Sequence, residues 1–217
     1  MGPSGHVTGL DVSPEVLHHA EKLVKDAGLS GRISFQQGDV RSLPFDDDRF
    51  DYAWNSSCVG YASFLDPVST LGELARVVKP GGAVAILVWS SESLLPGYPR
   101  LEAHLRATAP GIAPYEEEKG PEAHFLRALG WYRTLGLQEP KSHTVVVDAY
   151  APLADDVRNA LAALIEMRWP GAEAELTEED RSEYPRLCLP GSPDFVVDHP
   201  DYYAFFTCTL FHGKAPG

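Results

Sequence analysis

Short apolar runs alternate with amphipathic stretches over residues 1–89. The run His6 to Leu10 predicts a strand, and Ser13 followed by Pro14 predicts the start of a helix. Apolar residues then recur at helical spacing, which predicts one stripe facing the core: Val16, Leu17, Ala20, Val24 and Ala27. The chain therefore begins with a strand and an amphipathic helix.

Further strands and a second helix continue this alternation. Arg32 to Gln36 and Phe50 to Asn55 are predicted strands, and Asp66 with Pro67 opens a helix. Ala83 to Trp89 is a nearly unbroken apolar run, which is typical of a strand covered on both faces. Strands that alternate with helices predict an α/β, Rossmann-like doubly wound and mostly parallel sheet.

The pattern changes after Trp89. Residues 1–89 are predicted to form a partial Rossmann-like core, and residues 90–121, rich in proline, glycine and charge, a lid insertion. Residues 122–147 are predicted to supply a core helix and strand, and residues 148–199 a helical cap. The β-rich stretch within 200–217 is predicted to close the core.

The composition of the chain indicates which kinds of binding partner are not expected. With 217 residues, of which 44% are hydrophobic, the chain can bury a sizeable core. Its formal net charge of −13 repels phosphate backbones, so a nucleic acid is not an expected partner. No apolar run reaches the length of a membrane span, so no membrane is expected either. The three cysteines show no metal-like or disulfide-like spacing, which predicts a cytoplasmic location.

Acidic residues follow two neighbouring predicted strands. Asp11 ends the first strand, and Gly38-Asp39-Val40 follows the second. Doubly wound sheets bind ligands outside the carboxyl ends of their strands, where one carboxylate can accept bonds from ribose hydroxyls. A second carboxylate can accept from an adenine amine. Each acid also has a plain structural interpretation, as a turn residue that bonds its own backbone.

Taken in order, these segments resemble the class I S-adenosylmethionine-dependent methyltransferases, in particular the ubiquinone/menaquinone-biosynthesis-like group with small-molecule acceptors. The matching segments are Val7 to Ser13, Gly38-Asp39-Val40, Leu43-Pro44-Phe45, Phe50 to Asn55 and Glu73 to Gly82. The resemblance implies S-adenosylmethionine as the cofactor. Its cofactor-binding residues would be Asp11, Val12, Gly38, Asp39, Val40, Asn55 and Ser56. The resemblance also implies that the closing run Tyr202 to Phe211 is the last strand of the sheet and enters it antiparallel.

One part of that family pattern is absent. The family opens with a strand, a glycine-rich loop and a helix, and residues 1–5 resemble only the tail of that helix. The absent strand lies mid-sheet in the family, between the strands that here end at Asp11 and Asn55. An N-terminally truncated sequence is our preferred interpretation. A strand recruited from another chain, which would make a homo-oligomer, and a closed gap with loss of cofactor binding are the alternatives.

The reacting groups are less defined than the cofactor site. An oxygen or carbon acceptor needs a general base, but no catalytic residue is assigned. His104, His124 and His199 are candidates that are equally explained as surface residues, and Tyr61 is a candidate substrate contact. Aromatic residues of the insertions are candidates for an acceptor pocket or for core packing: Trp131, Tyr150, Trp169, Tyr184 and Phe195. No spacing of histidine and carboxylate residues predicts a metal site.

The leading hypothesis is thus methyl transfer to a small-molecule acceptor. The first alternative is a degenerate or fragmentary methyltransferase-like module that acts in protein interaction. The second is a nicotinamide-dependent oxidoreductase, which would also place Asp11 at a ribose but leaves Gly38-Asp39-Val40 without a role.

Overall fold

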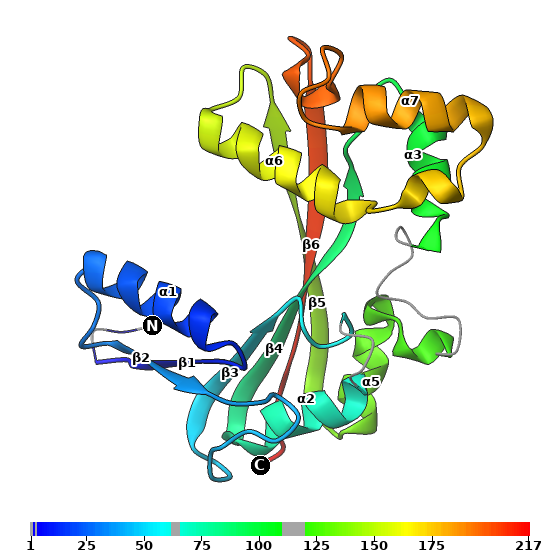
Figure 1. Ribbon diagram of the computed structural model, residues 1–217. Helices are drawn as coiled ribbons and strands as arrows, with labels where there is room; N and C mark the ends of the chain where they lie inside the picture. The colour runs from blue at the N-terminus through cyan, green and yellow to red at the C-terminus, as the bar shows by residue number, and fades with distance from the viewer. Residues whose placement is uncertain (1, 3, 62–65, 110–119) are drawn as a thin grey trace.

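The computed structural model describes residues 2, 4–61, 66–109 and 120–217. In this part of the chain, strands form a two-stranded and a four-stranded sheet, and helices gather at both ends of the larger sheet (Figure 1). The α/β class is confirmed.

The two-stranded sheet carries the first predicted acid. Its strands β1 (Val7–Asp11) and β2 (Ile33–Gln37) are parallel, with Val7 opposite Ile33 and Asp11 opposite Gln37. Helix α1 (Pro14–Asp26) connects them; Ser13 caps it, accepting a bond from the Val16 amide, and Pro14 opens its first turn. Figure 1 shows this unit beside the larger sheet.

The four-stranded sheet has the order β3-β4-β6-β5. Its strands are β3 (Phe50–Ser56), β4 (Val78–Ser93), β5 (Gln138–Tyr150) and β6 (Tyr203–Lys214). Strand β4 is parallel to β3, whereas β6 is antiparallel to both β4 and β5. The predicted antiparallel last strand is therefore confirmed, and it lies inside the sheet.

The lower end of this sheet is covered by helices α2 (Pro67–Arg76) and α5 (Ala128–Thr134). Two short 3₁₀ turns, η1 (Pro121–Ala123) and η2 (Phe125–Arg127), precede α5. The core here is built of fully buried side chains from the sheet and both helices, including Leu71, Val84, Ile86, Tyr132 and Phe211.

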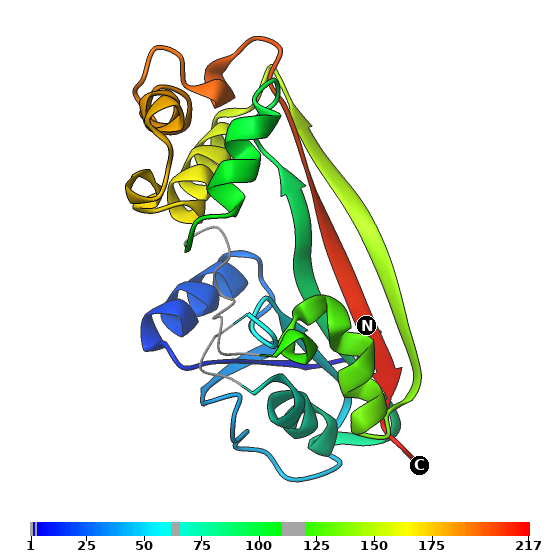
Figure 2. The same cartoon turned by 90° about the vertical axis from the view of Figure 1, so that its right-hand side faces the viewer.

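A second core lies at the upper end, where β4, β5 and β6 extend beyond the carboxyl end of β3 (Figures 1 and 2). Helices α3 (Pro99–Arg106), α6 (Asp155–Arg168) and α7 (Glu178–Cys188) form it with the turns η3 (Ala172–Ala174) and η4 (Val196–Asp198). Leu105, Ile165, Trp169, Leu187 and Phe195 are fully buried in it. We call this part the cap.

The structure differs from the sequence expectations in three elements. Helix α1 has no buried residue, so its apolar stripe does not face a core. The strand expected from Ala83 begins earlier, because β4 starts at Val78 and includes residues 79–82. The helix expected over 122–135 is broken into η1, η2 and the shorter α5, where His124 caps η2.

The cause of the first difference is the split of the sheet. Strands β1 and β3 do not pair, and in the part of the chain that the structure describes no strand lies between them. One backbone edge of each strand is therefore left without a ladder. The apolar stripe of α1 is consequently only half-buried against β1 and β2, and the rings of Tyr52 and Trp54 on β3 are half exposed.

Candidate functional site

The carboxyl ends of β1 and β2 are joined by backbone contacts. The Gly38 amide donates to the Asp11 carbonyl oxygen at 3.0 Å, so the two strand ends stay side by side. A Cβ at position 38 would lie 2.8 Å from the end of the Leu10 side chain and 3.1 Å from the Pro44 ring, so glycine lets these side chains pack closely against the backbone here. The predicted acids therefore project from adjacent points on one edge.

Asp11 makes one local bond and keeps one oxygen available. Its Oδ1 accepts from the Ser13 amide at 2.8 Å, which is the turn that aspartate favours. Among the residues that the structure describes, no group donates to Oδ2. Val12, the next residue, is 61% exposed. Asp11 can therefore bond a ribose hydroxyl through Oδ2 without giving up its turn.

The carboxylate of Asp39 accepts hydrogen bonds from Arg41, two residues later in the same turn. Its carboxylate accepts from the Arg41 amide at 2.8 Å and from Arg41 Nε and Nη2 at 2.9 Å and 2.6 Å. The pKa of Asp39 is lowered, chiefly by the side-chain bond from Arg41. The carboxylate side chain remains 35% exposed and has about four acceptor positions, so an adenine amine would share it with Arg41.

The segment after Asp39 is fixed to the lower core by helix α2. Glu73 accepts from the Leu43 amide at 3.0 Å, and Arg76 donates to the Leu43 carbonyl at 3.1 Å and to the Phe45 carbonyl at 2.9 Å. Val40 is half-buried and packs against the same core. Glu73 and Arg76 therefore fix the segment that follows the Asp39 turn.

The end of β3 meets the same edge. Asn55 Oδ1 accepts from the Val59 amide at 3.0 Å and shapes the turn that carries Cys58, while Ser56 is exposed. Burial raises the pKa of the Cys58 thiol most, the side-chain bond with Asn55 lowers it, and the negative charges of Asp11 and Asp39 raise it slightly. The turn after β3 is therefore shaped by Asn55 and carries a half-buried thiol.

Tyr61 lies behind this turn. Its hydroxyl donates to the Trp89 carbonyl oxygen of β4, and its ring stacks on Phe125 at 5.0 Å. Burial holds the pKa of Tyr61 well above its usual range, so the phenol stays protonated at neutral pH. Tyr61 is thus a fixed hydrogen-bonding group and not a base.

A contact between cap and core was not apparent from the sequence. Arg168, the last residue of α6, donates through Nε to Glu92 on β4, although the two lie 76 residues apart. The Glu92 side chain is only 4% exposed. Such a pairing follows no sequence spacing, so no local signal pointed to it.

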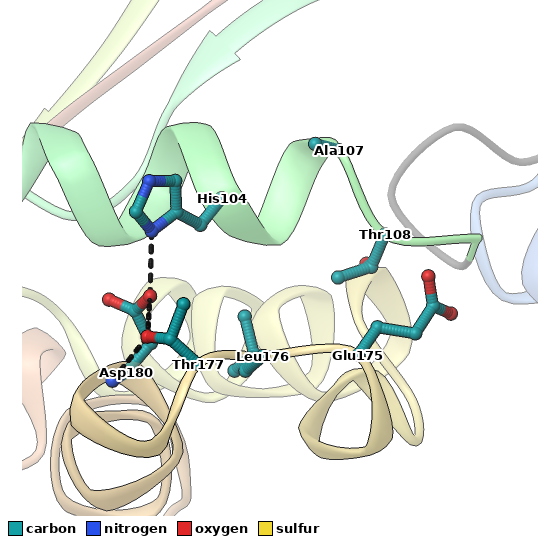
Figure 3. A pocket seen from close by; sticks show the side chains of 7 residues that line it. All are labelled: His104, Ala107, Thr108, Glu175, Leu176, Thr177 and Asp180. Carbon is teal, nitrogen blue, oxygen red and sulfur yellow. Dashed lines mark hydrogen bonds and ion pairs between the residues drawn. The ribbon is translucent and has the colours of Figure 1, made fainter.

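The histidine candidates fall into three places. His104 Nδ1 lies 2.6 Å from Asp180 Oδ2. Both residues line a pocket of about 220 Å³ between α3 and the start of α7 (Figure 3). Thr177 also donates to this carboxylate at 2.6 Å, and its bond is the main reason that the pKa of Asp180 is lowered. His124 caps η2 by accepting from the Leu126 amide, and burial lowers its pKa. His199 lies 3.5 Å from Asp201 near β6.

The aromatic residues of the insertions mostly pack into the cores. Trp131, Trp169, Tyr184 and Phe195 are at most 3% exposed, whereas Tyr150 is 65% exposed on β5. Within the described ranges, no group of three or more histidine, cysteine or carboxylate side chains is placed to hold a metal ion. Over the same residues, no helix has the length and apolar character needed to cross a membrane.

Known proteins match this chain in sequence. Residues 1–82 match the family model described as "Methyltransferase domain". The chain is 42% identical over 93 residues to the demethylmenaquinone methyltransferase of Bacillus subtilis (strain 168), which is 43% of this chain and 39% of that relative. It is 36% identical over 128 residues to the corresponding protein of Listeria welshimeri, which is 58% of this chain and 52% of that one. The chain thus spans about half or less of the length of these curated relatives.

Solved structures show the same fold. The YcgJ protein from Bacillus subtilis superposes with a TM-score of 0.52 at 16% identity, covering 98% of this chain and 83% of that one. A Bacillus halodurans protein with a proposed methyltransferase assignment gives the same TM-score and identity, covering 98% and 84%. In sequence, residues 1–82 are thus similar to the methyltransferase domain, and the fold of the described residues is similar to that of these solved structures.

Proposed function

We propose that the chain takes part in S-adenosylmethionine-dependent methyl transfer to a small-molecule acceptor. The observation that carries this proposal is that Asp11 and Asp39 follow the adjacent carboxyl ends of two paired parallel strands. This edge is where doubly wound folds bind their ligands. The family match covers the strands that build it. The demethylmenaquinone methyltransferases among the relatives support a small-molecule acceptor.

The proposed roles follow the positions of the side chains. Asp11 Oδ2 would accept from the ribose hydroxyls, beside the exposed Val12. Asp39 would accept from the adenine amine, with the Val40 amide and the close-packed Gly38 backbone beside the ring. Because Arg41 already donates to Asp39, the adenine amine would share this carboxylate with the Arg41 side chain.

The residues present fit the adenosine half of the cofactor better than its methionine half. Asn55 and the exposed Ser56 are the groups that β3 offers to the methionine portion, and Asn55 already bonds the Val59 amide. Between β1 and β3 the described residues supply no backbone loop. The cofactor itself supplies an activated methyl group, so the protein acts mainly by aligning the acceptor. Tyr61 is proposed to contact that acceptor.

A protein-interaction module is the second candidate function. The unpaired edges of β1 and β3 favour it, since such edges accept strands from other chains. A strand from a second copy would make a homo-oligomer. Under either function we propose a cytoplasmic location, because Cys58, Cys188 and Cys208 are free thiols.

The choice of cofactor is tested by calorimetry on the whole chain. We expect S-adenosylhomocysteine to release heat of binding with a one-to-one end point, and NAD to release none. Both ligands carry an adenosine with free ribose hydroxyls, but the pyrophosphate of NAD is negatively charged and would be repelled by two carboxylates. S-adenosylhomocysteine instead carries a zwitterionic amino-acid end, which Asn55 can bond. Binding of NAD in preference to S-adenosylhomocysteine would support the oxidoreductase hypothesis instead. Binding of neither would support the interaction module.

A further inference from the structure

A second polar cluster lies where the cap meets the core. Glu92 lies near the end of β4, and its buried carboxylate accepts from Nε of Arg168 at the end of α6. A buried carboxylate is stable as an ion only when it is paired. Glu92 therefore holds the Arg168 side chain in one place at the junction between the four-stranded sheet and the cap.

The contact with Glu92 uses only one edge of the guanidinium group. Arg168 is 30% exposed, and among the residues that the structure describes no acceptor bonds its Nη1 or Nη2. A guanidinium carries five N–H donors, of which the terminal ones bind a carboxylate or another anion in a planar, forked geometry. The remaining donors of Arg168 are therefore positioned by Glu92 and available to an anionic oxygen.

Aromatic side chains lie on the same face of the sheet. Glu92 is opposite Phe206, and Trp89 is opposite Cys208, in the ladder between β4 and β6. The half-buried rings of Trp89 and Phe206 stack with centroids 4.5 Å apart. Trp89 Nε1 is buried and has no hydrogen-bond partner in the described part of the chain. A planar ligand would gain contact with these rings beside the cation.

Tyr61 connects this cluster with the proposed cofactor site. The charges of Arg168 and Glu92 both act on its phenol, and its hydroxyl bonds the Trp89 carbonyl. Tyr61 also follows directly after the turn at the end of β3 that carries Asn55 and Cys58. A ligand held by Arg168 would therefore lie next to the strand ends at which the methyl donor is proposed to bind.

We propose that Arg168, held by Glu92, binds the anionic oxygen of a small planar acceptor that packs against Trp89 and Phe206. The acceptor class is an aromatic or conjugated acid, carrying a carboxylate or an ionised hydroxyl group. The net charge of −13 repels anions from most of the surface. An anionic acceptor would therefore bind where a cation such as Arg168 is held in place. The assignment of this ligand as the methyl acceptor rests on the proposed function.

The test compares benzoate with benzamide, which have the same shape and differ by one charge. Binding to the whole chain is measured by NMR titration, with each shifted amide assigned. We expect benzoate to bind at least about tenfold more tightly than benzamide, the factor that one charge-assisted bond provides. The shifts should centre on residues near Arg168 and Trp89. Equal affinity for the two ligands would overturn the proposal.

Variants assign the preference to one side chain. Arg168→Gln alone leaves Glu92 as an unpaired buried charge, so the double variant Glu92→Gln with Arg168→Gln is the one compared. It is expected to melt close to the wild type and to bind both ligands equally. Arg158→Gln on the same helix, which removes an exposed pair with Asp198, is the matched control and should keep the benzoate preference. A preference that survives in the double variant would show that another group binds the anion.

S-adenosylhomocysteine separates this proposal from the proposed function. If the chain binds it but does not distinguish benzoate from benzamide, the anion site is wrong and the proposed function stands. If the benzoate preference depends on Arg168 but S-adenosylhomocysteine does not bind, the anion site stands and the proposed function is wrong.

Discussion

Replacement of Glu102 by alanine is expected to lower the free energy of unfolding by about 3–5 kcal/mol, the cost of removing one partner from a buried charged network. The Glu102 side chain is 7% exposed and accepts from the Leu94 amide at 2.8 Å and from Arg106 Nη2 at 2.8 Å. The Leu95 amide and the Ser93 hydroxyl approach it at 3.4 Å and 3.2 Å. Alanine would leave the two buried amides without an acceptor, at the point where β4 enters the cap.

Urea unfolding followed by circular dichroism measures this loss. Glu102→Gln keeps one acceptor oxygen and should cost less than alanine, because an amide oxygen still reaches the Leu94 amide. Glu21→Ala on the exposed α1 is the control for loss of a surface charge, and it should stay within about 0.5 kcal/mol of the wild type. A Glu102→Ala variant as stable as Glu21→Ala would contradict the network.

The amides of β1 and β2 are expected to exchange with deuterium roughly a hundredfold or more faster than those of β4 and β6. Every described residue before Leu43 is exposed or half-buried, so this unit has no core of its own. A two-stranded sheet with one helix is marginal in water. In contrast, Val84, Ala85 and Ile86 of β4 are fully buried between two paired strands.

Hydrogen exchange measured by mass spectrometry on peptides checks this difference in rate. The same measurement with bound ligand tests the proposed cofactor site. If the strand ends bind S-adenosylhomocysteine, saturating ligand should slow exchange in β1 and β2 and leave the cap unchanged. Equal protection of the two sheets without ligand would mean that the smaller unit is stabilised by contacts beyond its own ladder.

Much of the fold could be predicted from periodicity and turn chemistry. The helix caps at Ser13 and Asp66 were predicted correctly, because side-chain oxygens satisfy the first amides of each helix. The strand that ends at Asp11 and the antiparallel last strand were also predicted. The prediction that the apolar stripe of α1 faces the core was wrong, because an amphipathic pattern reports which face is apolar and not how fully other elements cover it.

The candidate site could be predicted only in part. The positions of Asp11, Asp39 and Asn55 at strand ends follow from local patterns. The bonds of Asp39 to Arg41 and of Asn55 to Val59 depend on side-chain geometry that sequence spacing does not determine. The pairing of Glu92 with Arg168 joins distant segments, so only the folded chain reveals it.

Titration of S-adenosylhomocysteine into the wild type and into Asp11→Asn, Asp39→Asn and Asp51→Asn variants, followed by calorimetry, tests the central claim most directly. Asp51 is an exposed carboxylate on β3 whose salt bridge to Lys79 makes it a matched control. We expect the wild type and Asp51→Asn to bind with equal affinity. The Asp11 and Asp39 variants should each bind at least about tenfold more weakly, since each loses a charge-assisted bond. Equal affinity in all four proteins, or no binding by the wild type, would contradict the claim that these two carboxylates hold one adenosine.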